Sequence, residues 1–185
     1  MRALHDRGFT LIEVLTTAAI IGVLASIVVI SLQGARAKGR DAQRLTDLKN
    51  IEIALVSYKL ENGFYPKTDP NAASGTGYSW TGNCSLLGAW TDGNKSNVGP
   101  TAWIPGLAPT YIQQLPTDPK SDTNKCYMYS SDGKDYMVMA HFTVESYTEA
   151  NNPKPRPAYV TGGGCPYPGA YENDFAIYTP GAKCW

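Results

Sequence analysis

The chain has 185 residues, which is enough for one globular domain with an additional segment. Its 16 lysines and arginines balance 16 aspartates and glutamates, so it lacks the positive surplus that is usual for nucleic-acid binders. Only 17 % of the residues are charged, and 18 glycines and 13 prolines predict a body rich in turns. We therefore expect no nucleic-acid partner and a single small, loop-rich domain.

Residues 9–32 form an apolar stretch in which Glu13 is the one charged residue. As a helix this stretch spans about 36 Å, more than the ~30 Å hydrocarbon core of a bilayer. A secretory signal peptide has an apolar region of only about 7–15 residues, although Ala35-Arg36-Ala37 offers a cleavage site of that kind. A plain membrane anchor leaves Glu13 without a role, since a carboxylate costs about 2.5–3.5 kcal/mol at the membrane centre. Glu13 is therefore predicted to be functional.

The residues around Glu13 resemble a known processing site. The run Arg7-Gly8-Phe9-Thr10-Leu11-Ile12-Glu13 is similar to the class III leader junction of type IV prepilins and type II secretion pseudopilins. The resemblance implies that residues 1–8 are a leader and that a membrane-embedded prepilin peptidase cuts after Gly8. It also implies that the peptidase methylates the new N-terminal amine of Phe9, and that Glu13 is the family's assembly acid.

The resemblance implies partners and a location as well. The subunit is expected in the cytoplasmic (inner) membrane, where it contacts lipid and an assembly machinery. It then joins identical or related pilin subunits in an extracellular or periplasmic filament. The basic residues that follow the span (Arg36, Lys38, Arg40 and Arg44) favour the opposite orientation on charge alone. The leader and the cysteines outweigh them, so we expect the C-terminal part outside.

Two kinds of partner would satisfy the carboxylate of Glu13. A neighbouring subunit's N-terminal amine at Phe9 would relieve the cost of both charges and fix the register between subunits. Alternatively, the free N–H groups in the first turn of its own helix would satisfy the carboxylate.

Residues 33–62 are predicted to continue as an amphipathic helix that enters the head and ends at Asn62-Gly63. Apolar side chains recur at helical spacing: Leu45, Leu48, Ile51, Leu55 and Tyr58, with Ile53, Val56 and Leu60 widening the stripe. The opposite, polar face carries charged residues: Arg40, Asp41, Arg44, Asp47 and Lys49. The first half of the whole helix is thus apolar all round and the second half amphipathic.

Residues 63–185 are predicted to form the head. The turn-rich stretch 64–110 is expected to be an irregular loop, and Leu107–Leu115 a short helix. Three tryptophans are expected to pin that loop to the core: Trp80, Trp90 and Trp103.

A β-hairpin is predicted where Cys126–Ser131 and Lys134–Thr143 flank Asp132-Gly133, a two-residue turn signal. His141 is expected to point out of its strand toward solvent. Two weaker strand signals follow: Tyr159–Thr161 and Phe175–Tyr178. A long helix followed by an antiparallel sheet fits a pilin-like α+β fold.

Cys84, Cys126, Cys165 and Cys184 all lie in the head. No pair has the tight spacing of a zinc site, so we expect no metal and two disulfides, which places the head outside the reducing cytoplasm. Four cysteines allow three pairings. We favour Cys84–Cys126 and Cys165–Cys184.

No enzyme class is indicated. The sequence lacks the phosphate-binding GxxxxGK[ST] loop, the GxSxG nucleophile motif and the HExxH zinc motif, and no cofactor is expected. Asp118, Asp122, Asp132 and Asp135 match no EF-hand spacing and are expected to be solvated turn acids.

The predicted function is that of a structural subunit of a type IV pilus-like filament, because many pseudopilin heads are smaller and lack disulfides. Two alternatives are a pseudopilin of a type II secretion or DNA-uptake system, and a secreted aromatic-rich binding domain released after Ala37.

Overall fold

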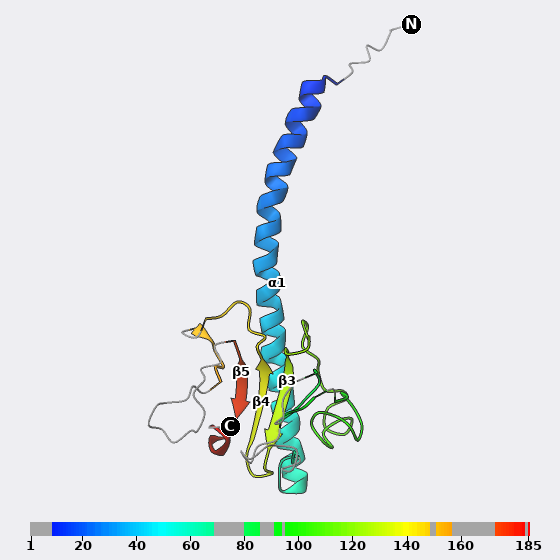
Figure 1. The fold of residues 1–185 in the computed structure, drawn as a ribbon, viewed down its shortest axis with the longest axis vertical. Coiled ribbons are helices and arrows are strands. Elements are labelled where there is room, and N and C mark those ends of the chain that lie inside the picture. Colours follow the sequence, from blue (N-terminus) through cyan, green and yellow to red (C-terminus); the bar gives the residue numbers. More distant parts are fainter. Residues whose placement is uncertain are drawn as a thin grey trace. The chain divides into compact units, whose positions relative to one another are not determined.

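The computed structural model describes residues 9–68, 80–85, 91–93, 95–148, 151–156, 173–183 and 185. Its main elements are helix α1 (Leu11–Asn62) and, in the described residues, a five-stranded sheet (Figure 1). The chain divides into two compact units, Met1–Lys38 and Gly39–Trp185, and helix α1 begins in the first and ends in the second. A pilin-like α+β fold, with one long N-terminal helix and an antiparallel sheet, is confirmed.

The sheet has the strand order β2-β1-β3-β4-β5. Strand β4 (Tyr136–His141) pairs antiparallel with β3 (Cys126–Ser131) on one side and with β5 (Phe175–Tyr178) on the other. Strand β1 (Trp80–Gly82) also pairs antiparallel with β3, on the edge away from β4. The short strand β2 (Thr91–Asp92) pairs parallel with β1. The hairpin β3–β4 and strand β5 lie where the sequence predicts strands. Strands β1 and β2 fall inside the stretch predicted to be an irregular loop.

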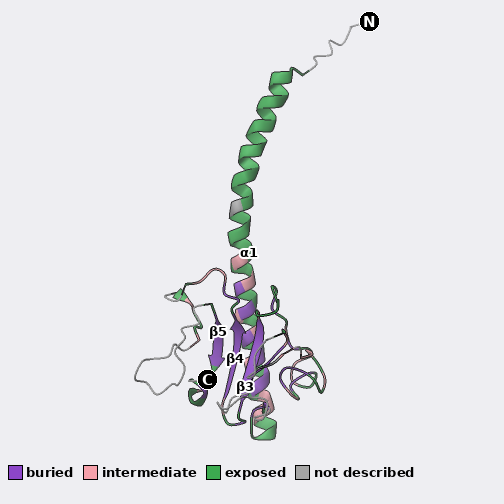
Figure 2. Cartoon of the chain, in the orientation of Figure 1, coloured by how far each residue is buried: buried purple, intermediate pink, exposed green. Residues whose placement is uncertain are grey.

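One face of the sheet packs on the second half of α1. Tyr127, Tyr129 and Val138 share a buried core with Leu48 and Leu55 of the helix, as their alternation and helical spacing predict. Figure 2 shows these strands and the neighbouring part of the helix as the buried region of this unit.

The other face of the sheet is buried too. Met128, Met137 and Met139 form a second cluster there, against Trp80 and the C-terminal Trp185. The 3₁₀-helix η3 (Pro180–Ala182) contributes its buried alanine to the same cluster. Because this cover hides the face, most strand positions that alternate away from α1 are buried, and Tyr178 at the end of β5 is an exception.

The turn of the hairpin is longer than predicted. Ser131 pairs with Tyr136, which leaves the four residues 132–135 between the strands instead of two. The Asp132 carboxylate accepts the backbone N–H groups of Lys134 and Asp135, both at 2.8 Å, and this bonding stabilises the wider loop.

The short helix predicted over Leu107–Leu115 is also wrong, because this stretch consists of turns and bends. One helical hydrogen bond forms, from the Tyr111 N–H to the Leu107 carbonyl at 2.9 Å. Pro109 has no N–H to extend the pattern, and Gly106 has a φ of +71°.

The apolar stripe of α1 is narrower than predicted. Leu48, Ile51 and Leu55 are buried, whereas Ile53 is 56 % exposed and Leu60 is 82 % exposed. The core is wide enough for one face of the helix, so the residues predicted to widen the stripe stay outside it. The predicted strand Tyr159–Thr161 and Trp90 lie outside the described residues.

Two neighbouring isoleucines test this helix orientation. Ile51→Ala removes a fully buried side chain and should lower the free energy of unfolding by about 2–5 kcal/mol. Ile53→Ala, the matched control on the exposed side, should change it by less than about 0.5 kcal/mol. Denaturant unfolding of the full chain in detergent micelles measures both, and equal losses would contradict the orientation.

Candidate assembly site

Helix α1 starts with reciprocal hydrogen bonds between Thr10 and Glu13. The Thr10 N–H donates to Glu13 Oε2 at 2.8 Å, and the Thr10 hydroxyl donates to the same oxygen at 2.7 Å. In return the Glu13 N–H donates to Thr10 Oγ1 at 3.4 Å. This arrangement is a capping box, in which two residues three apart satisfy backbone groups that a helix start leaves without partners. The T-x-x-E spacing is its sequence signal, and the Thr10 N–H bond is the kind expected if the first turn of the same helix satisfies Glu13.

The capping box leaves part of the Glu13 carboxylate free. Both hydrogen bonds to the carboxylate use Oε2, so within the described part of the chain Oε1 remains open to a second donor. The side chains of Phe9, Thr10 and Glu13 are all exposed. Glu13 can therefore cap its own helix and still accept a hydrogen bond from outside it.

The rest of the apolar stretch is exposed as well. From Phe9 to Leu32 every side chain that the structure describes is exposed, and the helix is long and apolar enough to cross a membrane (Figure 2). Two hydroxyl groups of this stretch bond inside the helix: that of Thr17 donates to the Glu13 carbonyl at 2.9 Å, and that of Ser26 donates to the Val23 carbonyl at 2.7 Å. A polar group satisfied in this way is tolerated in lipid or against another apolar helix.

In the second unit, a buried arginine of α1 bonds three carboxylates. Arg44 Nε and Nη2 donate to Asp118 Oδ2 and Oδ1 at 2.6 and 3.0 Å. Arg44 Nη1 donates to Asp41 Oδ1 at 2.7 Å and to Glu145 Oε1 at 2.9 Å. Burial lowers the pKa of Arg44, but the hydrogen bonds and charge of Asp118, with the other carboxylates, raise it overall. The guanidinium thus stays charged and ties the helix to the loop after Leu115.

Asp41 and Glu145 complete this cluster. The Asp41 carboxylate accepts the N–H of Glu145 and the N–H and hydroxyl of Ser146, the last at 2.6 Å. Glu145 accepts a bidentate pair from Arg40 at 2.7 and 2.6 Å. The Arg40 hydrogen bond, followed by those of Arg44 and Lys120, lowers the pKa of Glu145 to about 2 against partial burial.

This cluster corrects two predictions. Asp41 and Arg44 were expected on a polar outer face of the helix, but both are fully buried. Asp118 was expected to be a solvated turn acid, but it is only 3 % exposed and pairs with Arg44. Helical spacing alone places charged residues outside, and it misses charges whose partners come from distant parts of the chain.

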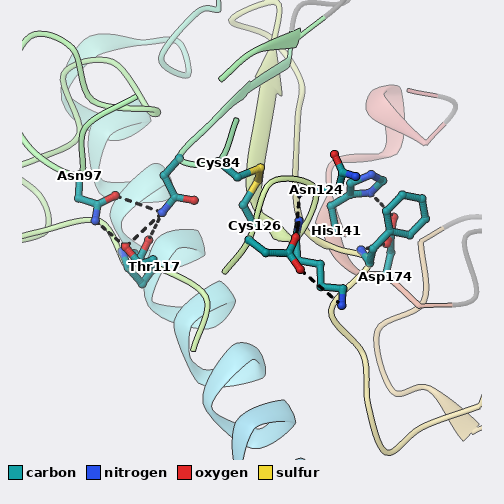
Figure 3. Close-up of a disulfide and its surroundings, with 12 residues drawn as sticks. Cys84, Asn97, Thr117, Asn124, Cys126, His141 and Asp174 are labelled. Atoms are coloured by element: carbon teal, nitrogen blue, oxygen red, sulfur yellow. Dashed lines mark hydrogen bonds and ion pairs between the residues drawn. A yellow bond between two sulfur atoms is a disulfide. The ribbon is translucent and has the colours of Figure 1, made fainter. Parts of the chain in front are cut away.

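The disulfide between Cys84 and Cys126 is present in the structure and is the first of the two favoured pairs (Figure 3). It joins Cys84, two residues after the end of β1, to Cys126, the first residue of β3. Cys165 and Cys184 lie outside the described residues, so the second pairing stays a prediction. Among the described residues, no group of three histidine, cysteine or acidic side chains is placed to hold a metal.

His141 does not point to solvent as predicted. It is 6 % exposed, and its Nδ1 lies 3.1 Å from Oδ2 of the fully buried Asp174 (Figure 3). Asp174 also accepts the Phe142 N–H at 2.6 Å. The prediction is wrong because the second face of the sheet is covered.

Comparison with known proteins agrees with the processing site that the sequence predicts at the N-terminal segment. Residues 4–29 match the prokaryotic N-terminal methylation motif. The chain is 44 % identical over 65 residues to the type II secretion system core protein G of Pectobacterium carotovorum subsp. carotovorum, covering 35 % of this chain and 42 % of that protein. It is 47 % identical over 62 residues to core protein G of Vibrio cholerae serotype O1, covering 34 % and 42 %.

A third relative aligns over a longer stretch. Core protein G of Pseudomonas aeruginosa is 29 % identical over 119 residues, which is 64 % of this chain and 71 % of that protein. The matches to the first two relatives span less than half of their length. No solved structure matches the chain.

An exposed apolar helix with a single acid near its start, continuing into a small α+β head, defines a pilin-like protein. With the methylation motif and these relatives, the chain is similar to type IV pilins and type II secretion pseudopilins.

The charge cluster predicts how stability depends on pH. The pKa of Glu145 is about 2 in the folded protein against an ordinary 4.5, so folding favours the ionised form. The contribution of Glu145 to the free energy of unfolding is present above about pH 4.5 and is lost as the pH falls through about 2. Between these values wild type should lose about 3 kcal/mol more of its free energy of unfolding than Glu145→Gln does.

Denaturant unfolding measured at several pH values tests this prediction. Glu52→Gln is the matched control, because Glu52 forms a surface pair with Lys49. Its pH profile should follow that of wild type. Parallel profiles for wild type and Glu145→Gln would contradict the role of Glu145.

Proposed function

We propose that the chain is a pseudopilin, a structural subunit of the filament of a type II secretion system. The observation that carries this proposal is the similarity to core protein G of several bacteria, together with the methylation motif over residues 4–29. The longest alignment has 119 residues, more than the 52 of helix α1, so the similarity extends beyond the helix. The assembled pseudopilus, related subunits and the secretion machinery are the partners that this function implies.

The second candidate function is that of a subunit of a type IV pilus. It uses the same kind of N-terminal segment, and the disulfide and the long loop of the head favoured it in the sequence. The curated relatives favour the secretion system instead, since each carries the name of a secretion protein. The release of a soluble domain after Ala37 is disfavoured, because residues 35–37 lie inside helix α1 rather than in an extended segment.

In this proposal each part of the chain has a role. The leader, residues 1–8, is removed by the prepilin peptidase, and Phe9 becomes the methylated N-terminus. The exposed stretch 9–32 anchors the subunit in the inner membrane and later packs against other subunits. Residues 33–62 carry the helix into the head, which residues 63–185 complete. The filament is then periplasmic.

The proposal is tested by deleting the gene and restoring it. Secretion of the system's exported enzymes should stop in the deletion strain and return with the wild-type chain but not with Gly8→Val, which should keep its leader. Surface pili should not change. Loss of pili with normal secretion would favour the pilus subunit, and a mature protein that begins at Lys38 would favour the released domain.

Glu13 is proposed to pair with the N-terminal amine of a neighbouring subunit. Processing would create a positive charge at Phe9 in apolar surroundings, where each charge relieves the cost of the other. The free Oε1 allows this pair to form while Thr10 stays bonded to Oε2. A single polar contact of this kind fixes the axial register that apolar side chains alone leave undefined.

Two substitutions separate the charge of Glu13 from its capping role. Glu13→Gln removes the charge but keeps the cap, since glutamine serves equally well at this position of a capping box. It should be processed and inserted normally but form few or no filaments. Thr10→Val, the matched control, removes the hydroxyl cap and keeps the charge, so it should still assemble.

Filament yield and leader cleavage are measured for both variants. Wild-type filament yield from Glu13→Gln would eliminate the charge pair. Equal loss in Thr10→Val would assign the role of Glu13 to capping.

A further inference from the structure

The proposed function gives no role to the basic residues that follow the apolar stretch of α1. Arg36, Lys38 and Arg40 lie close together there. From residue 14 to residue 40 the sequence contains no acidic residue that could balance them. On charge alone these residues favour the cytoplasmic side, opposite to the orientation that the leader and the cysteines predict. A positive charge placed against this bias needs an explanation of its own.

The structure divides these basic residues into two groups. Arg40 donates two hydrogen bonds to Glu145, at 2.7 and 2.6 Å, and the next one along, Arg44, is buried among its three carboxylates. Arg36 and Lys38, in contrast, are exposed, and neither forms a salt bridge or a side-chain hydrogen bond with any residue that the structure describes. Two cations are therefore available to a ligand outside the chain.

With the apolar stretch in a bilayer, both cations lie near the depth of the lipid headgroups. They belong to the first unit, as the apolar stretch does, and they follow Leu32 on the same continuous helix. A rise of about 1.5 Å per residue places Arg36 about 6 Å and Lys38 about 9 Å beyond Leu32. Each headgroup layer is about 5–8 Å thick, and long basic side chains can reach back toward it along their apolar stems.

The two cations leave the helix on nearly opposite sides. Positions two residues apart are separated by about 200° around an α-helix. A single protein partner contacts one side of a helix, so its acidic side chains could meet Arg36 or Lys38 but not both. Lipids surround a transmembrane helix, and their phosphate oxygens accept hydrogen bonds from arginine and lysine. This arrangement favours lipid over one polypeptide as the ligand.

We propose that Arg36 and Lys38 bind the phosphate groups of anionic phospholipids, one headgroup on each side of the helix. The lipids belong to the leaflet on the side of the head. This inference rests on the proposed function in one respect, that the subunit lies in the inner membrane before assembly. Removal of the leader takes away Arg2 and Arg7, which leaves Arg36 and Lys38 to hold the mature subunit at the membrane surface.

NMR of the full-length chain in neutral maltoside micelles tests the proposal, with the amide signals of Ala35 and Ala37 as the readout. Short-chain phosphatidylglycerol should shift both signals saturably. It should bind about fivefold more tightly than short-chain phosphatidylcholine, whose headgroup has no net charge, since this is the usual contribution of one basic residue to binding an anionic membrane. Inorganic phosphate should give no saturable shift at these concentrations, because it does not enter the micelle.

Arg36→Gln combined with Lys38→Gln should abolish the preference for phosphatidylglycerol. The matched control is Lys49→Gln combined with Lys134→Gln, which removes the same charge from two exposed lysines of the second unit. The control should keep the fivefold preference. All four side chains are exposed, so neither double variant should change the melting temperature of the head, and a lost preference is then not unfolding.

Several results would overturn the proposal. Equal binding of the two lipids by wild type, or an unchanged preference after both substitutions, would show that the cations do not select anionic lipid. Saturation by inorganic phosphate at the same concentrations would assign them to a free anion. Loss of filaments with the lipid preference intact would assign them to a neighbouring subunit. The secretion test is independent of these results, because a pilus subunit with the same anchor would show the same lipid preference.

Discussion

The head depends on how one buried cation is satisfied. Arg44 has no exposed surface, and its guanidinium donates four hydrogen bonds to carboxylates. Removing a partner from such a pair typically costs about 3–5 kcal/mol, because the remaining charge stays buried. Asp118 and Glu145 meet this need from segments 74 and 101 residues away. Both segments must therefore contact the helix in the folded head.

That requirement also orients the helix about its axis. With Arg44 facing Asp118, the positions four, seven and eleven residues later turn to the same side, which places Leu48, Ile51 and Leu55 in the core. Ile53 and Leu60 are then left on the opposite side, exposed. The charge cluster and the apolar stripe thus enforce the same orientation, one through directed hydrogen bonds and the other through burial.

Sequence patterns predicted what depends on near neighbours. The leader junction, the apolar helix, the Leu48–Leu55 stripe and the β3–β4 hairpin are all set by residues a few positions apart. The burial of Arg44, Asp118 and His141 was missed because each depends on a partner far along the chain, which periodicity cannot identify. The Thr10–Glu13 cap is different, since its signal is local and readable.

The two units differ in the surfaces that they expose. Between Phe9 and Leu32 the first unit exposes mostly apolar side chains around one acid, and the hydroxyls of Thr17 and Ser26 bond within the helix. Such a surface suits lipid and neighbouring helices alike, so it carries little information about which filament is built. The head instead carries the directed interactions of the chain, the disulfide and the charge cluster.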